Sequence, residues 1–96
     1  MYGLTFDLDA NLLQDDYQIT RPKAYSVIDK TLTDLGFARI QCNFYVLQNP
    51  KNGMNFLFDM NDELGKYEWF NACVHDIAAF KLEDWSDITE SFKRKL

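Results

Sequence analysis

The chain has 96 residues and a net charge of −5, and 47% of its residues are hydrophobic. This length predicts one domain over residues 1–96, and the apolar content excludes a disordered chain. The negative charge argues against a protein that coats nucleic acid with high affinity, because such proteins neutralise phosphates with many basic side chains.

The sequence carries no signal for secretion or for a membrane. No signal peptide precedes the first predicted strand, and no apolar run is long enough to span a bilayer. Cys42 and Cys73 lie far apart, without a second cysteine or histidine at a metal-binding spacing. We therefore expect a cytoplasmic protein with free thiols and no membrane association.

The first predicted element is a β-strand over residues 2–6, which leads into two acidic residues, Asp7 and Asp9. A carboxylate at the end of a strand can lie at the mouth of a sheet, where ligands gather in α/β proteins. Aspartates also end strands because their side chains bond turn amides. On position alone, both interpretations are open for Asp7.

A helix is expected after a polar connection over residues 11–18. Thr20 can cap its start, Pro22 fits the first turn because its missing N–H is not needed there, and Gly36 can end it in a left-handed conformation. Apolar residues at steps of three and four positions form one face of this helix. They are Tyr25, Ile28, Leu32 and Leu35.

Residues 37–48 are predicted to be extended, with Cys42 and Asn43 between two strand-forming runs. Asparagine tolerates a positive φ, which favours a tight turn. The absence of glycine leaves both a hairpin and a bent single strand open. Residues 49–53 then indicate a loop.

A second helix is predicted after this loop, because apolar residues recur again at helical spacing. The pattern fades at Gly65, and residues 69–73 suggest one further apolar turn. The stripe of this helix consists of Met54, Leu57, Phe58, Asn61 and Leu64.

The last predicted strand covers residues 77–82, with alternate side chains on one face. A short terminal helix or tail follows, with basic residues at its negative end. The strand face is expected to carry Ala78, Phe80 and Leu82, and the terminal helix Trp85, Ile88 and Phe92.

This order of elements predicts an α+β protein with the ferredoxin-like βαββαβ fold. A four-stranded antiparallel sheet would carry two helices on one face, with a short C-terminal helix or tail. The other face needs a cover, so we expect a homodimer joined through the sheet or the tail. Topology alone says nothing of the chemistry.

Few residues carry the pattern of a catalytic site. The single histidine, His75, has no nucleophile beside it in a recognisable motif, so a structural role is favoured. Glycine-rich phosphate loops and zinc-binding spacings are absent. The remaining candidates are short polar side chains near predicted strand ends, namely Asp7, Asp9, Asn43, Asp76 and Asp84.

Asp7 follows the strand that is central in a ferredoxin-like sheet, so two copies of it can meet across a dimer groove. Two facing carboxylates can hold a divalent cation such as Mg²⁺ or share a proton. Either arrangement supports acid–base or metal-assisted chemistry on a phosphodiester. A bound cation would also offset the negative charge of the protein.

Several motifs recur along nearly the whole chain in the order of one known family. They are MY-x-L-x-FDL at residues 1–8, LGF-x-R-x-Q at 35–41, Tyr45 in the third strand, EWF at 68–70 and V-x-DI-x-AFK-x-ED-W-SD-x-T at 74–89. In these motifs the sequence resembles the virulence-associated protein D (VapD) family.

The resemblance implies a ferredoxin-like homodimer, akin to the small CRISPR-associated protein of the spacer-adaptation complex. It also implies an endoribonuclease that cleaves single-stranded RNA or mRNA, in some members as the toxin of a pair with an antitoxin protein. The site residues carried over are Asp7 and Asp76, with Asn43 in support and Asp7 as the ligand of any Mg²⁺ ion. No motif supports Asp9, for which a turn role suffices.

The sequence departs from the family pattern at two places. Cys42–Asn43 replaces Gly-Ser after the second strand, and Asn43 can form hydrogen bonds but cannot act as a nucleophile or proton shuttle. His75 and Ala78 replace basic residues around Asp-Ile, which removes charge-assisted bonds to phosphate. These departures and the acidic charge support an alternative, a non-catalytic dimeric adaptor with the same fold.

Overall fold

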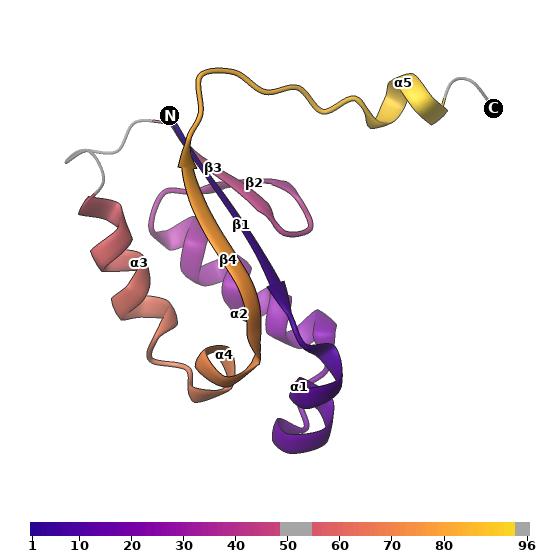
Figure 1. Cartoon of the computed structure of the whole chain (residues 1–96), viewed down its shortest axis with the longest axis vertical. Coiled ribbons are helices and arrows are strands. Elements are labelled where there is room, and N and C mark those ends of the chain that lie inside the picture. The colour runs from indigo at the N-terminus through magenta and orange to yellow at the C-terminus, as the bar shows by residue number, and fades with distance from the viewer. Residues whose placement is uncertain (49–54, 94–96) are drawn as a thin grey trace.

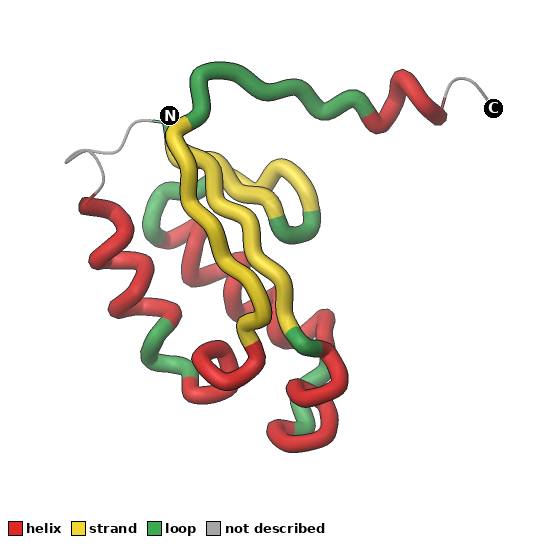
Figure 2. The backbone as a smooth tube through the Cα atoms, in the orientation of Figure 1, coloured by secondary structure: helices red, strands yellow, loops and turns green. Residues whose placement is uncertain are grey.

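The computed structural model describes residues 1–48 and 55–93 (Figures 1 and 2). The elements follow one another as a strand, two helices, two strands, two helices, a strand and a last short helix. In chain order they are β1 (Tyr2–Leu8), α1 (Ala10–Tyr17), α2 (Arg21–Asp34), β2 (Ala38–Gln41), β3 (Phe44–Leu47), α3 (Phe56–Leu64), α4 (Glu68–Cys73), β4 (Val74–Lys81) and α5 (Thr89–Lys93).

The four strands form one antiparallel sheet with the order β2-β3-β1-β4, so β1 lies in the middle. Leu4, Phe6 and Leu8 alternate along β1 and are buried. They share one core with α2 and α3, so both helices cover the same face of the sheet. This arrangement confirms the predicted α+β, ferredoxin-like fold.

The predicted ends of the long helix α2 are confirmed. The Thr20 side chain accepts a hydrogen bond from the Lys23 amide at 3.4 Å, and Pro22 lies in the first turn. Gly36 follows the helix with a φ of 98°, a conformation that residues with a Cβ atom rarely adopt.

Residues 38–47 form a hairpin, which decides between the two alternatives left by the sequence. Neither Cys42 nor Asn43 has a positive φ, so the tolerance of asparagine for that conformation is not what closes the turn. The register shifts between Arg39 and Gln41, and such an irregularity adds local bend and twist to a hairpin.

The polar connection predicted over residues 11–18 is wrong, because most of it forms helix α1. The Asp9 side chain caps this helix by accepting a hydrogen bond from the Leu12 amide at 3.0 Å, which gives Asp9 a local structural role. Leu13 is fully buried in the core, and Gln18 ends the helix with a φ of 51°. Burial of this side chain and the cap outweigh the polar composition that suggested a loop.

The predicted stripe of α3 is confirmed at Leu57 and Leu64, which pack in or against the core, but is wrong at Phe58 and Asn61. Phe58 is 69% exposed and Asn61 is exposed, whereas Met60 and Leu64 are buried. Successive helix residues are about 100° apart, so Phe58 lies on nearly the opposite side from Met60. The stripe's first residue, Met54, and the whole of the predicted loop at 49–53 lie outside the described residues.

The apolar turn suggested over residues 69–73 is present as helix α4, which leads directly into β4. The strand begins at Val74, earlier than predicted, and ends at Lys81. Leu82 lies just beyond it, where its amide donates to the Met1 carbonyl at 2.9 Å. Pairing with β1 along its whole length explains the early start.

The sheet face turned away from α2 and α3 carries a small aromatic group. The Phe44 ring stacks on Phe80 with centroids 6.4 Å apart and meets Trp85 edge-on at 6.3 Å. A Cβ atom on Gly3 would come 2.4 Å from the Phe80 ring, so glycine permits this close approach. Beyond this group the chain runs away from the sheet to α5 (Figure 1). The predicted terminal helix is thus confirmed for Phe92 but wrong for Trp85 and Ile88, which precede α5.

Both cysteines are free thiols, as expected, with Cys42 exposed and Cys73 buried. Among the helices of residues 1–48 and 55–93, none combines the length and the apolar character needed to cross a membrane.

Leu13→Ala is expected to destabilise the protein by about 2–5 kcal/mol, because it leaves a cavity in the core beneath α1. Urea unfolding followed by circular dichroism measures the change. Gln14→Ala, at the next and exposed position of α1, should alter the free energy of unfolding by less than about 0.5 kcal/mol. Equal stability of the two variants would show that α1 is not anchored in the core.

Candidate active site

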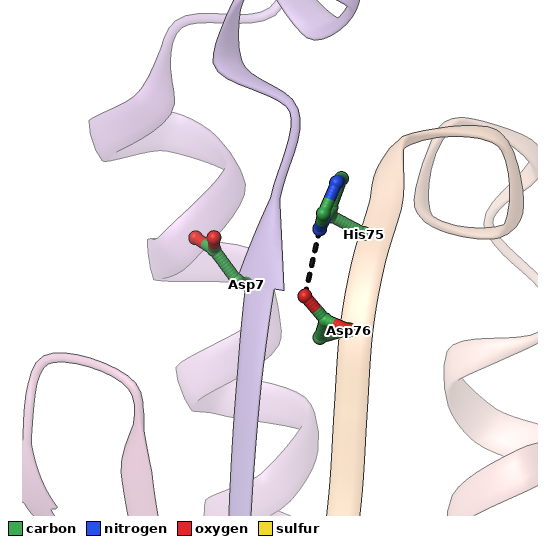
Figure 3. Close-up of side chains that lie close together, drawn as sticks. All are labelled: Asp7, His75 and Asp76. Carbon is green, nitrogen blue, oxygen red and sulfur yellow. Dashed lines mark hydrogen bonds and ion pairs between the residues drawn. The ribbon is translucent and has the colours of Figure 1, made fainter.

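The candidate site lies on the two neighbouring strands β1 and β4, near the end of β1 (Figure 3). In the register of the sheet, Asp7 is the direct partner of Asp76. Both side chains are exposed, and the Asp7 Oδ1 atom accepts a hydrogen bond from the Leu8 amide at 3.1 Å. The sheet therefore brings together two acids that are far apart in the sequence.

A third side chain, His75, joins these acids because the pairing of the two strands is irregular there. Asp7 pairs with Asp76 and Leu8 pairs with Val74, so His75 is the extra residue of a β-bulge. Bulges re-aim side chains that a regular strand would send to opposite faces. One ligand atom from each of Asp7, His75 and Asp76 lies within 4.8 Å of the other two.

The imidazole of His75 is held by the neighbouring carboxylate. Its Nδ1 atom lies 2.7 Å from Asp76 Oδ2, and the two side chains are 69% and 76% exposed. This hydrogen bond, with the negative charge of Asp76, raises the pKa of His75 above its ordinary value, and the carboxylates of Asp7 and Asp9 raise it further. Because Nδ1 is engaged, Nε2 is the nitrogen open to a ligand.

Asn43 lies beside β1 but is committed to the backbone. Its side-chain NH₂ donates to the Phe6 backbone carbonyl at 3.0 Å, and its backbone carbonyl accepts from the Phe6 amide at 3.3 Å. The two bonds attach the turn of the β2–β3 hairpin to β1 one residue before Asp7. Asn43 is thus placed to position the strand end that carries Asp7.

The other acidic candidates lie apart from this group. Asp9 caps α1, and the Asp84 carboxylate accepts from the Trp85 amide at 2.8 Å in the C-terminal segment. Within one chain, the acid that faces Asp7 is Asp76, whereas the sequence suggested a second copy of Asp7.

His75 is the residue of this group for which the sequence favoured a structural role. It is an exposed side chain beside both acids, so its surroundings are those of the candidate site. The sequence held one indication of a functional role, namely that His75 stands next to Asp76 where the family has a basic residue. That signal could not show the bulge, because strand register depends on the partner strand.

Nearly full-length similarity links this chain to a group of curated proteins. It is 39% identical over 93 residues to "Endoribonuclease VapD" of Helicobacter pylori, a match that covers 97% of this chain and 99% of the relative. It is 39% identical to "Endoribonuclease VapD homolog" of Neisseria gonorrhoeae, with the same coverage, and 37% identical to "Endoribonuclease VapD" of Dichelobacter nodosus, covering 97% of this chain and 98% of the relative. No family model matches the chain.

The pKa of His75 is expected to lie above about 6.5 in the folded protein, because the adjacent carboxylate of Asp76 stabilises the imidazolium. Asp76→Asn should lower this pKa toward the ordinary value. The interaction stabilises the fold fully below the unfolded pKa, and its contribution is lost as the pH rises through the folded pKa. An NMR titration of the His75 ring protons measures both values, and an identical pKa in the two proteins would contradict the assigned contact.

Proposed function

Because the chain belongs to the VapD family of endoribonucleases, we propose that it is an endoribonuclease that cleaves single-stranded RNA such as mRNA. The observation that carries this proposal is the cross-strand pair of Asp7 and Asp76 in a chain that aligns with endoribonucleases over 97% of its length. In this proposal both acids act in cleavage, and Asp7 is central.

The negative charge of the two acids has to be offset before a phosphodiester can approach them. Two carboxylates and an imidazole are oxygen and nitrogen donors that suit a divalent cation, and Mg²⁺ suits the two carboxylates best. Asp7 would be the main ligand, with Asp76 and His75 next to it. Such a cation supplies a Lewis acid that polarises a phosphoryl oxygen.

The remaining roles follow from the contacts of each side chain. Asp76 orients the His75 ring through Nδ1, so that Nε2 is presented to the substrate or to a cation. Asn43 acts through its bonds to Phe6, which fix the strand end next to Asp7. An amide in this place retains a positioning role without a hydroxyl group.

Asp7→Asn is expected to lower the rate of RNA cleavage by about 100-fold or more, because it removes the charged oxygen at the centre of the site. Cleavage of a labelled single-stranded RNA by purified protein measures the change. The matched control is Asp59→Asn, which alters an exposed aspartate on α3 and should cleave like the wild type.

The same assay includes wild type treated with EDTA, whose activity should fall and return when Mg²⁺ is added. Full activity in EDTA would refute the proposed cation but leave the role of Asp7 standing. Equal degradation by wild type and Asp7→Asn would mean that the activity comes from a contaminant. That result would favour the alternative, a non-catalytic dimeric adaptor.

The proposal extends to a toxin that acts in the cytoplasm and is held inactive by an antitoxin protein. What supports it is the proposed activity itself, because mRNA cleavage stops protein synthesis. Induced expression of wild type in a bacterial host should arrest growth, and expression of Asp7→Asn should not. Normal growth with active wild-type enzyme present would contradict the toxin role.

We propose that the chain forms a homodimer through its C-terminal segment, residues 82–93. Its first residues contact the sheet through Leu82 and Trp85, and the rest of the segment extends away from the sheet to α5 (Figure 1). No residue of α5 is buried, and Ile88 is 57% exposed just before that helix. An apolar side chain on an extended arm is suited to packing on a second copy of the chain.

Ile88→Asp should weaken the dimer by at least about tenfold, because it puts a charge into an apolar contact. Light scattering at a series of concentrations measures the dissociation constant. Phe58→Asp is the matched control, since Phe58 is also exposed but lies on α3, on the helical side of the sheet. A monomeric wild type, or equal weakening by both substitutions, would refute this interface.

A further inference from the structure

A cavity of about 460 Å³ lies at the start of α2, next to the hairpin. Its walls come from the first turns of α2, from β2 and from the hairpin turn. Arg21 and Arg39 both line it, and they are the two arginines among residues 1–48 and 55–93. The chain as a whole has a net charge of −5, so two guanidinium groups lining one cavity make the local charge there positive, opposite in sign to the rest.

Arg21 is held in place at the rim of the cavity. Its guanidinium carbon lies 5.0 Å from the centre of the Tyr25 ring, and its Nη2 atom donates to the Tyr25 hydroxyl at 3.3 Å. The ring in turn packs on Phe6, with centroids 5.7 Å apart. These contacts fix the direction of the guanidinium and leave its other N–H groups available for an anion.

The cavity also contains one acidic residue, Asp29, whose carboxylate is engaged. Its Oδ1 atom accepts a hydrogen bond from the hydroxyl of buried Tyr45 at 2.7 Å. Two positive side chains therefore face one negative side chain that is tied to the wall. The positive end of the α2 dipole lies at the same place and adds to the attraction for an anion.

The hairpin turn connects this cavity to the candidate active site. Cys42 lines the cavity, while the next residue, Asn43, bonds to Phe6 beside Asp7. The charge of Asp7 is among the influences that raise the pKa of Arg21, which places the two groups within electrostatic range. A chain bound at Asp7 can thus continue over the turn into the cavity.

We propose that this cavity binds the phosphate backbone of single-stranded RNA next to the cleaved bond, through Arg21 and Arg39. The proposal rests on the proposed function and adds to it the element that an acidic endoribonuclease lacks, a local cationic contact for the substrate. Arginine suits this task because its planar group donates two parallel hydrogen bonds to a phosphate.

The test measures binding without cleavage. Fluorescence anisotropy follows the binding of a short fluorescein-labelled single-stranded RNA to the Asp7→Asn protein, with and without Arg21→Gln or Arg39→Gln. Each arginine substitution should weaken binding about tenfold, since it removes a charge-assisted contact. The slope of the logarithm of affinity against the logarithm of salt should fall by about 0.7 for each lost phosphate contact.

Lys66→Gln is the matched control, because it removes the same charge from an exposed ion pair. In that pair Lys66 Nζ lies 2.9 Å from Glu63 Oε1. It should leave both the affinity and the salt slope unchanged. Arg21→Lys and Arg39→Lys should keep the salt slope while binding more weakly than arginine. If the arginines had a purely structural role, the lysine variants would not keep the salt slope while losing affinity. Circular dichroism confirms that each variant is folded.

Equal weakening by Lys66→Gln and the arginine variants would overturn the proposal, and so would an unchanged salt slope or an absence of RNA binding. Normal binding by the arginine variants, together with cleavage that depends on Asp7, would refute the cavity and leave the proposed function intact. Asp7-independent cleavage would refute the proposed function instead, while the anisotropy data still decide whether the cavity binds RNA.

Discussion

The pairing of β1 with β4 is the constraint on which the rest of the structure depends. On one face it aligns Leu4 with Ala79, against the helical layer, and pairs buried Phe6 with Ile77. Side chains alternate along a strand, so the same register sends the residues between them to the other face. A shift of β4 by one residue would turn Asp76 toward the core and Ala79 away from it, so fold and site are fixed by one set of hydrogen bonds.

The candidate site sits where this pairing becomes irregular. Regular strands would place His75 and Asp76 on opposite faces, and the bulge at His75 brings both within reach of Asp7. The group is exposed, as a site for a long polymer must be. In the proposed function, cations offset its negative charge, either a bound metal ion or the protonated histidine.

The distribution of charge gives an acidic protein a way to hold an anionic substrate. Repulsion by the overall charge weakens non-specific binding, and the arginines near the start of α2 act at one place only. In the proposed binding mode, contact at this one place also confines the RNA chain to one path past Asp7. Phosphate binding by Arg21 and Arg39, away from the acids, is consistent with a chain in which His75 and Ala78 replace basic residues around Asp76.

Much of the fold could be predicted from the sequence by itself, because its signals are local. The cap at Thr20, the left-handed turn at Gly36 and the spacing of apolar residues in α2 act over a few residues. The fold class and the central place of the first strand followed from the order of the elements. The phase of α3 and the existence of α1 depended on the burial of Met60 and Leu13, which local pattern does not fix.

The sequence determined Asp7 and Asp76 as candidates, but only the tertiary structure decided that they face one another, that His75 joins them, and that two arginines share one cavity. Those are relations between separate segments, set by strand register and packing.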